Sequence, residues 1–148
     1  MVTSTRDRVP LNTDACINAS IRRKTENNIA YYASGGSDAI TRRLAELDQE
    51  WDIERMLETN AATATLIGMT LGITVSKKWF VLPAVIAGFL LQHAVQGWCP
   101  PLPVLRRMGF RTASEIDYER YALKALRGDF RNVSEAGTAG HALAAAEC

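Results

Sequence analysis

The residues of this chain best suited to chemistry follow directly after a long apolar stretch. Cys99 lies beside Trp98, and Arg106 and Arg107 come soon after it. Cationic neighbours favour the thiolate form of a cysteine, which is the nucleophile in thiol chemistry, whereas burial among apolar groups disfavours it. A cysteine also serves as a small apolar residue at a helix end. Cys99 is therefore a candidate reactive thiol, with plain packing as its alternative role.

Three polar side chains lie within the apolar stretch itself, at Gln92, His93 and Gln96. Polar groups inside a membrane are costly and often functional. Hydrogen bonds from these groups to the threonines of the preceding apolar segment are a sufficient explanation for them. His93 and Cys99 are six residues apart, so in one continuous helix they point away from each other, and we expect no metal site and no cofactor.

No other arrangement of residues indicates catalysis. Cys16 and Cys148 are far from Cys99 in sequence, so the three cysteines form neither a disulfide framework nor a CxxC motif. We find no phosphate-binding loop, no Ser/His/Asp arrangement and no paired carboxylates. The sequence favours a protein that is not an enzyme, and no catalytic residue beyond the candidate Cys99 is assigned.

The elements that position these residues are two uncharged segments, 59–76 and 79–98, separated by Lys77 and Lys78. From Trp79 to Gly97 a helix of 19 residues spans roughly 28 Å, close to the apolar thickness of a bilayer. Trp79 and Trp98 stand at its two ends, where indole rings favour the membrane–water boundary. The sequence predicts an all-α fold built on a transmembrane helical hairpin over 59–98, with the lipid bilayer as its partner.

Charge is segregated along the chain in the manner of a membrane protein. The 17 Lys and Arg and 16 Asp and Glu side chains give a net charge of +1, and only Lys77 and Lys78 fall within 59–98. A balanced charge argues against a dedicated nucleic-acid binder. The first 20 residues have no apolar core typical of a signal peptide, so we expect the N-terminus to be retained. A soluble bundle that buries both apolar segments is a competing interpretation.

The N-terminal flank divides into two parts. Residues 1–36 are expected to be a flexible N-terminal arm, with a short helix over 21–33 as an alternative within it. Residues 37–58 are expected to form an amphipathic helix that begins with Ser37 as N-cap and continues unbroken into 59–76. Ile40, Leu44, Leu47 and Trp51 follow at helical spacing on one face.

The C-terminal flank is expected to be a cytoplasmic segment over 99–130. Pro100 and Pro101 end the apolar helix, and the chain is expected to stay extended just after them. Thr112 and Glu115 have the spacing of a capping box, which predicts a helix over 113–127. Residues 131–148 are expected to be a disordered tail.

Orientation follows from the basic residues next to the apolar segments. The turn carries two, whereas the flanks carry six: Arg42, Arg43, Arg55, Arg106, Arg107 and Arg111. The positive-inside rule then places both termini in the cytoplasm. Lys77, Lys78, Trp79, Trp98, Arg106 and Arg107 are the expected membrane-interface residues.

Small residues recur every four positions in both segments, which permits close helix packing in lipid. The first segment has Ala64, Gly68 and Gly72, and the second has Ala84 and Gly88. The two stripes either face each other within the hairpin, or Gly68 and Gly72 form the seam of a homodimer.

One short motif carries a family resemblance. The run QGWCPP at 96–101, followed by Leu105, Met108 and Gly109, resembles the GWCP signature of the YgaP-like inner-membrane family, and 47–55 and 119–130 resemble the flanks of its stand-alone bacterial members. The resemblance implies a bacterial inner-membrane domain of two helices that self-associates and has no assigned function. Some members are fused to a rhodanese domain, which carries sulfur as a persulfide; we expect no such domain within these 148 residues.

Two functions are therefore expected. The first is a small integral membrane protein that acts as an anchor or interaction module, with Trp51 and Tyr121 facing a cytoplasmic protein partner. The alternative is a thiol- or persulfide-handling membrane protein that uses Cys99 in sulfur relay or export.

Overall fold

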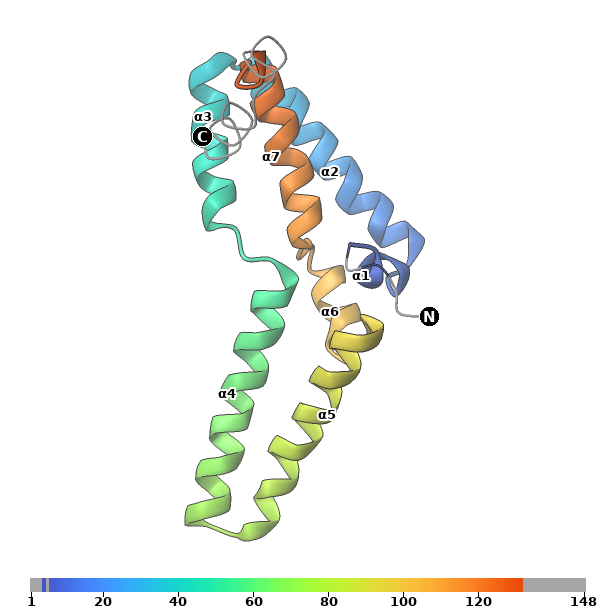
Figure 1. Ribbon diagram of the computed structural model, residues 1–148, viewed down its shortest axis with the longest axis vertical. Coiled ribbons are helices and arrows are strands. Elements are labelled where there is room, and N and C mark those ends of the chain that lie inside the picture. Colours follow the sequence, from blue (N-terminus) through green and yellow to red (C-terminus); the bar gives the residue numbers. More distant parts are fainter. Residues whose placement is uncertain (1–3, 5, 132–148) are drawn as a thin grey trace. The chain divides into compact units, whose positions relative to one another are not determined.

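The computed structural model describes residues 4 and 6–131, and the described chain is all-helical, which confirms the predicted class (Figure 1). No strand occurs in this part of the chain. The elements are α1 (Arg8–Leu11), α2 (Ala15–Ser34), α3 (Gly36–Gln49), α4 (Ile53–Thr74), the 3₁₀ turn η1 (Lys77–Phe80), α5 (Val81–Gln96), α6 (Leu102–Arg107) and α7 (Ala113–Arg127).

The chain divides into two compact units. The first unit consists of Met1–Ile21 and Trp51–Ser114, and it holds α1, α4, η1, α5 and α6. The second unit consists of Arg22–Glu50 and Glu115–Cys148, and it holds α3, most of α2 and most of α7.

In the first unit α4 and α5 pack side by side and run in opposite directions through η1 (Figure 1). Glycines on α4 allow the close approach. A Cβ added at Gly68 would lie 2.7 Å from Pro83, and one added at Gly72 would lie 2.7 Å from Phe80. The small residues of α4 therefore pack within the hairpin. They do not face Ala84 and Gly88, however, and Gly88 has no neighbour within 4 Å of an added Cβ.

A small core closes the end of the hairpin opposite η1. Six buried side chains form this core: Val9, Ile53, Leu57, Cys99, Leu102 and Leu105. Met56, Trp98 and Phe110 are partly buried and pack against it. The backbone N–H of Ile53 donates to the carbonyl of Arg111 at 2.8 Å, which ties the start of α4 to the segment before α7. These contacts hold Cys99 in the interior.

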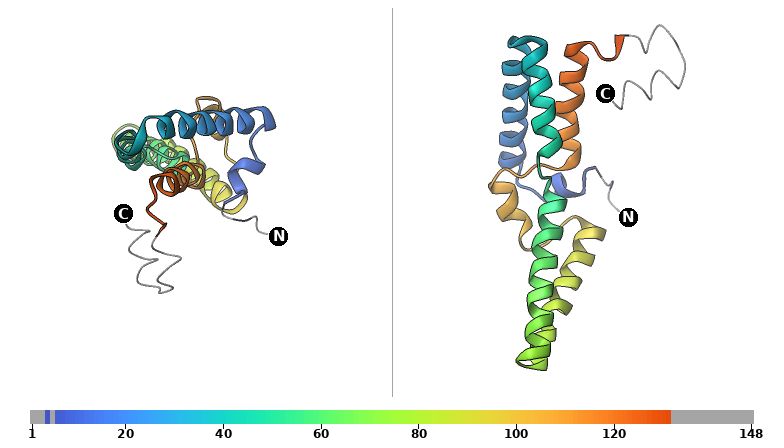
Figure 2. Two further views of the ribbon diagram at one scale, coloured as in Figure 1. Left: turned by 90° about the horizontal axis from the view of Figure 1, so that it is seen from above. Right: turned by 90° about the vertical axis from the view of Figure 1, so that its left-hand side faces the viewer.

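In the second unit α3 lies beside α7 (Figure 2). Ile40, Leu44 and Leu47 of α3, which the sequence placed on one face, form a core with Ile116 and Leu123 of α7. Nε of Arg43 donates to the fully buried carboxylate of Glu119 at 2.7 Å. The helix over 113–127 is confirmed with the predicted bounds.

The predicted unbroken helix from 37 into 76 is wrong. α3 ends at Gln49, Glu50 is extended, and α4 begins anew at Ile53. Asp52 is the N-cap of α4, because its carboxylate accepts from the backbone N–H of Arg55 at 2.8 Å. α3 starts at Gly36, so Ser37 lies inside the helix rather than at its cap.

Two further expectations about the flanks are also wrong. The segment expected as a flexible arm over 1–36 holds α1 and the 20-residue α2, and the short helix suggested over 21–33 lies within α2. The segment after Pro101 is helical rather than extended, because Pro103 falls in the first turn of α6, where proline is tolerated. The tail expected over 131–148 lies outside the described residues from 132 onward.

Only one segment among the described residues, Lys77–Gln96, is long and apolar enough to cross a membrane. Its side chains are largely exposed, since almost none of its most apolar window is buried. α4 is long enough but less apolar, because threonines interrupt it.

Candidate functional site

The candidate site is created by a reversal of the chain at the end of α5. Gly97 caps the helix in the left-handed conformation, with φ of +75°. A Cβ at this position would lie 2.4 Å from the carbonyl oxygen of Arg8, so both the backbone angle and the close approach require glycine. The reversal returns Cys99, which is 4% exposed, to an electrostatic interaction with the imidazole of His93.

The expectation that His93 and Cys99 point away from each other is therefore wrong. It assumed one continuous helix through both residues, whereas α5 ends at Gln96 and the turn at Gly97 changes the direction of the chain. The reversal could not be deduced from helical spacing.

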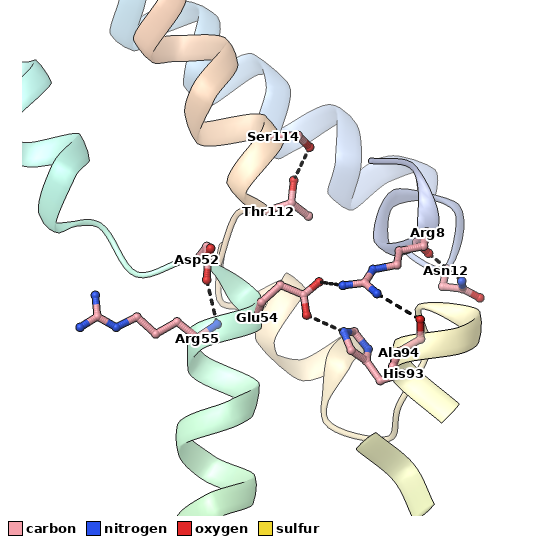
Figure 3. Close-up of polar contacts among 9 residues, drawn as sticks. All are labelled: Arg8, Asn12, Asp52, Glu54, Arg55, His93, Ala94, Thr112 and Ser114. Atoms are coloured by element: carbon pink, nitrogen blue, oxygen red, sulfur yellow. Dashed lines mark hydrogen bonds and ion pairs between the residues drawn. The ribbon is translucent and has the colours of Figure 1, made fainter. Parts of the chain in front are cut away.

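His93 is held by a carboxylate from the first turn of α4. Its Nε2 lies 2.9 Å from Oε2 of Glu54, and the other oxygen of Glu54 accepts from Arg8 at 2.9 Å. Figure 3 shows the Glu54 carboxylate between the imidazole of His93 and the guanidinium of Arg8. Arg8 also donates to the carbonyl of Ala94 at 3.1 Å, so α1, α4 and α5 meet at this carboxylate.

His93 bonds to Glu54 and not, as the sequence predicted, to the threonines of the first apolar segment. Thr63, Thr70 and Thr74 donate to carbonyls one turn back in their own helix, as expected of threonine in apolar helices. The polar partner of His93 is instead Glu54, a charged residue in the first turn of α4. Glu54 and Arg8 are thus the site residues that sequence reasoning missed.

The protonation of this group follows from its contacts. The hydrogen bond from His93 holds the pKa of the Glu54 carboxyl below its usual value; partial burial opposes this effect, and the charge of Arg8 adds to it. An ionised Glu54 accepts the proton on Nε2, which leaves Nδ1 as the ring nitrogen that can exchange a proton with another group. Nδ1 is buried and has no hydrogen-bond partner in the described chain.

Glu54, His93 and Cys99 provide a carboxylate next to an imidazole and the imidazole next to a thiol, which is the arrangement that activates a cysteine nucleophile. The carboxylate fixes the tautomer of the imidazole and stabilises its cationic form, and the imidazole takes the proton of the thiol. Glu54, His93 and Cys99 supply these three parts in the first unit. Across residues 4 and 6–131, no three His, Cys, Asp or Glu side chains are grouped so as to hold a metal ion.

A pocket of about 230 Å³ lies next to this thiol, between α4 and α5. Cys99 forms part of its wall, together with Pro100 and Pro101. Almost all of the other lining is hydrocarbon, and Ala64, one of the predicted packing residues, belongs to it. Cys99 therefore faces an apolar space although its side chain is nearly inaccessible to bulk water.

The other polar residues of α5 are peripheral. Gln92 is half-buried and Gln96 is exposed. The backbone carbonyl of Gln96 accepts from Asn12 at 2.9 Å, which contributes to holding the N-terminal segment against the end of α5.

The predicted interface residues fall into two groups. Lys77, Lys78, Trp79 and Arg107 are exposed. Trp98 is partly buried against the small core.

Arg106 does not fit the predicted interface role. It is fully buried and donates to the carbonyl of Phe110 at 3.0 Å and to the side chain of Asn18 at 2.8 Å. An arginine with both of these bonds ties α6 to the start of α2 instead of facing a lipid surface.

Comparisons of this chain with protein-family models, with curated proteins and with solved structures find no match. The function must therefore be argued from the residues and their geometry.

Proposed function

We propose that the protein is a small integral membrane protein whose first unit inserts as a helical hairpin and acts as an anchor or interaction module. The observation that carries this proposal is the exposure of large apolar side chains around α5, including Val81, Val85, Leu91 and Val95. A contiguous apolar surface of this kind is unusual on a soluble monomer and is expected of a surface that faces lipid.

The second crossing, by α4, is supported by two observations. Leu66, Ile67 and Ile73 are exposed on it. The hydroxyls of three of its threonines bond within the helix, which lowers the cost of placing them in hydrocarbon. In this proposal α4 and α5 enter the bilayer as a pair, because α4 packs tightly within the hairpin at Gly68 and Gly72.

The remaining parts of the proposal concern setting and partners. The protein belongs to the bacterial inner membrane and to the YgaP-like family, with both termini in the cytoplasm. Trp51 and Tyr121, both exposed, serve contacts with a cytoplasmic protein. Because Gly68 already packs against α5 and Gly72 against Phe80 of η1, a homodimer would use the exposed face of Ala84 and Gly88.

Membrane insertion is tested by fractionating bacterial cells that express the full chain. We expect the protein to stay in membranes washed with alkaline carbonate and to leave them with detergent. For orientation, Ser76→Cys and Ser37→Cys are made separately in a chain with its three cysteines changed to serine. An impermeant maleimide should label position 76 in intact cells and position 37 only after lysis. Release by carbonate alone contradicts insertion, and labelling of position 37 in intact cells contradicts the orientation.

A second candidate function is thiol handling at Cys99, of which sulfur relay is one form. The interaction with His93 favours it, because a buried cysteine used only for packing needs no imidazole beside it. In detergent, Cys99 should react with N-ethylmaleimide faster in the wild type than in His93→Gln, with the exposed Cys16 as internal reference. A persulfide-selective tag tests for bound sulfur. Equal rates in the two proteins contradict this candidate.

A further inference from the structure

The pocket beside Cys99 follows from two helix faces that meet. On α4 its lining includes Leu57, Ala61 and Ala64, which are spaced by four and three residues. On α5 it includes Ile86 and Phe89, three residues apart. Residues at these spacings share one side of a helix, so the pocket runs along the seam between α4 and α5.

The same two faces lead from the pocket to the polar group. Glu54 lies one turn before Leu57 on α4, and His93 lies one turn after Phe89 and Leu90 on α5. These two residues bond to each other at 2.9 Å. The hydrogen-bonded imidazole therefore lies one helical turn beyond the residues that line the apolar pocket, and Cys99 forms part of the pocket wall.

The lining indicates what chemical group the pocket takes. Apart from Cys99, the side chain of Asn60 is the polar one among the residues that line it. A hydrocarbon chain gains free energy in such a space, whereas a small anionic sulfur species would lose hydration without finding donors in return.

We propose that Cys99 is an S-acylation site that accepts an apolar acyl group from an acyl thioester, with the hydrocarbon chain in the pocket between α4 and α5 and His93 as the base. This inference rests on the second candidate function and names its substrate class. Glu54 is a positioning residue, because it acts through the imidazole and does not contact the acyl group.

The transfer balances without a further reactant. His93 takes the thiol proton at Nδ1, and the sulfur of Cys99 attacks the carbonyl carbon of the thioester. A carbon–sulfur bond to Cys99 forms and the carbon–sulfur bond to the donor breaks. The proton on His93 passes to the departing thiolate, and no atom is oxidised or reduced.

The test uses the purified full chain in detergent micelles with two probes, decanoyl-coenzyme A and acetyl-coenzyme A. Acylation is measured by intact mass, by its loss in hydroxylamine and by peptide mapping. We expect decanoyl transfer to Cys99 that exceeds both acetyl transfer and transfer to Cys16 in the same molecules. His93→Gln should slow it by about 10² or more, the usual contribution of a general base.

A pocket variant tests where the acyl chain binds. Ala64→Phe fills the space between the helices, so decanoyl transfer to Cys99 should fall by a larger factor than acetyl transfer. If circular dichroism shows that His93→Gln does not fold, Ala64→Phe still tests whether the acyl chain binds in this pocket. Equal decanoyl transfer in Ala64→Phe and wild type overturns the assignment of the pocket.

The remaining outcomes distinguish this inference from the function it rests on. If Cys99 reacts with N-ethylmaleimide in a manner that depends on His93 but takes no acyl group, the acyl proposal fails and the reactive thiol stands. If Cys99 is inert toward every reagent, both fail. Acylation of Cys16 at the same rate as Cys99 overturns the acyl proposal as well.

Discussion

The turn at Gly97 provides the sharpest test of how the site is assembled. Replacing Gly97 with alanine imposes two costs. A non-glycine residue in the left-handed conformation costs about 1–2 kcal/mol. The new Cβ would also lie 2.4 Å from the carbonyl oxygen of Arg8, and forcing an extra carbon into a packed contact costs a further ~1–3 kcal/mol. We expect Gly97→Ala to lower the free energy of unfolding by about 2–5 kcal/mol.

Two other glycines separate these costs. Gly109 has φ of +92° but open space around an added Cβ, so Gly109→Ala should cost about 1–2 kcal/mol from the backbone alone. Gly88 lies inside α5 with nothing within 4 Å, so Gly88→Ala should stabilise the helix by about 0.5–1 kcal/mol. The difference between Gly97→Ala and Gly109→Ala then isolates the contact with Arg8.

The assay is urea or thermal unfolding in detergent micelles, followed by circular dichroism. Maleimide labelling of Cys99 under native conditions is the second readout, because a displaced turn should uncover this buried thiol. If Gly97→Ala is no less stable than Gly109→Ala and Cys99 stays protected, the close approach of Arg8 to the turn, and the argument built on it, is refuted.

Three further predictions follow from the packing and the ion pairs. Gly68→Ile should separate α4 from α5 and lower the thermal stability in micelles, since its Cβ has no room. Glu119→Gln should destabilise the second unit by roughly 3 kcal/mol, because it leaves the largely buried Arg43 without its closest carboxylate. The stability contributed by Glu54 should be complete above its ordinary pKa of 4.5 and be lost as the pH falls through the lower value of the folded protein, measured as the difference in unfolding free energy from Glu54→Gln.

Each of these has a matched control. Gly88→Ile, at an open position of α5, should cost less than the change at Gly68. Asp48→Asn removes one of the two exposed carboxylates that pair with Arg120 and should cost under ~1 kcal/mol, in contrast to Glu119→Gln. For Glu54, a difference from Glu54→Gln that grows as the pH falls below 4.5 would contradict the assigned direction of its pKa.

Short-range sequence patterns predicted α3 and α7, but they missed α1, most of α2 and α6. The spacing of Ile40, Leu44 and Leu47 predicted the buried face of α3, and the signals around 113–127 predicted α7 with its observed bounds. The break between α3 and α4 was missed although a local signal existed, namely Asp52 three residues before the backbone N–H that it caps. Glu50, Asp52 and Glu54 are compatible with the polar face of one continuous helix and also with the start of a new one.

The sequence by itself determined the helical class, the apolar segment over 79–98 and the choice of Cys99 and His93 as candidates, because these depend on residue type and short spacing. Tertiary structure decided that the two candidates meet, since a single positive φ at Gly97 redirects the chain. It also decided that Glu54 and Arg8, 39 and 86 residues away from their partners in α5, complete the group. Contacts between residues so far apart in sequence depend on how the helices pack against each other, and the residue spacing within one helix does not predict them.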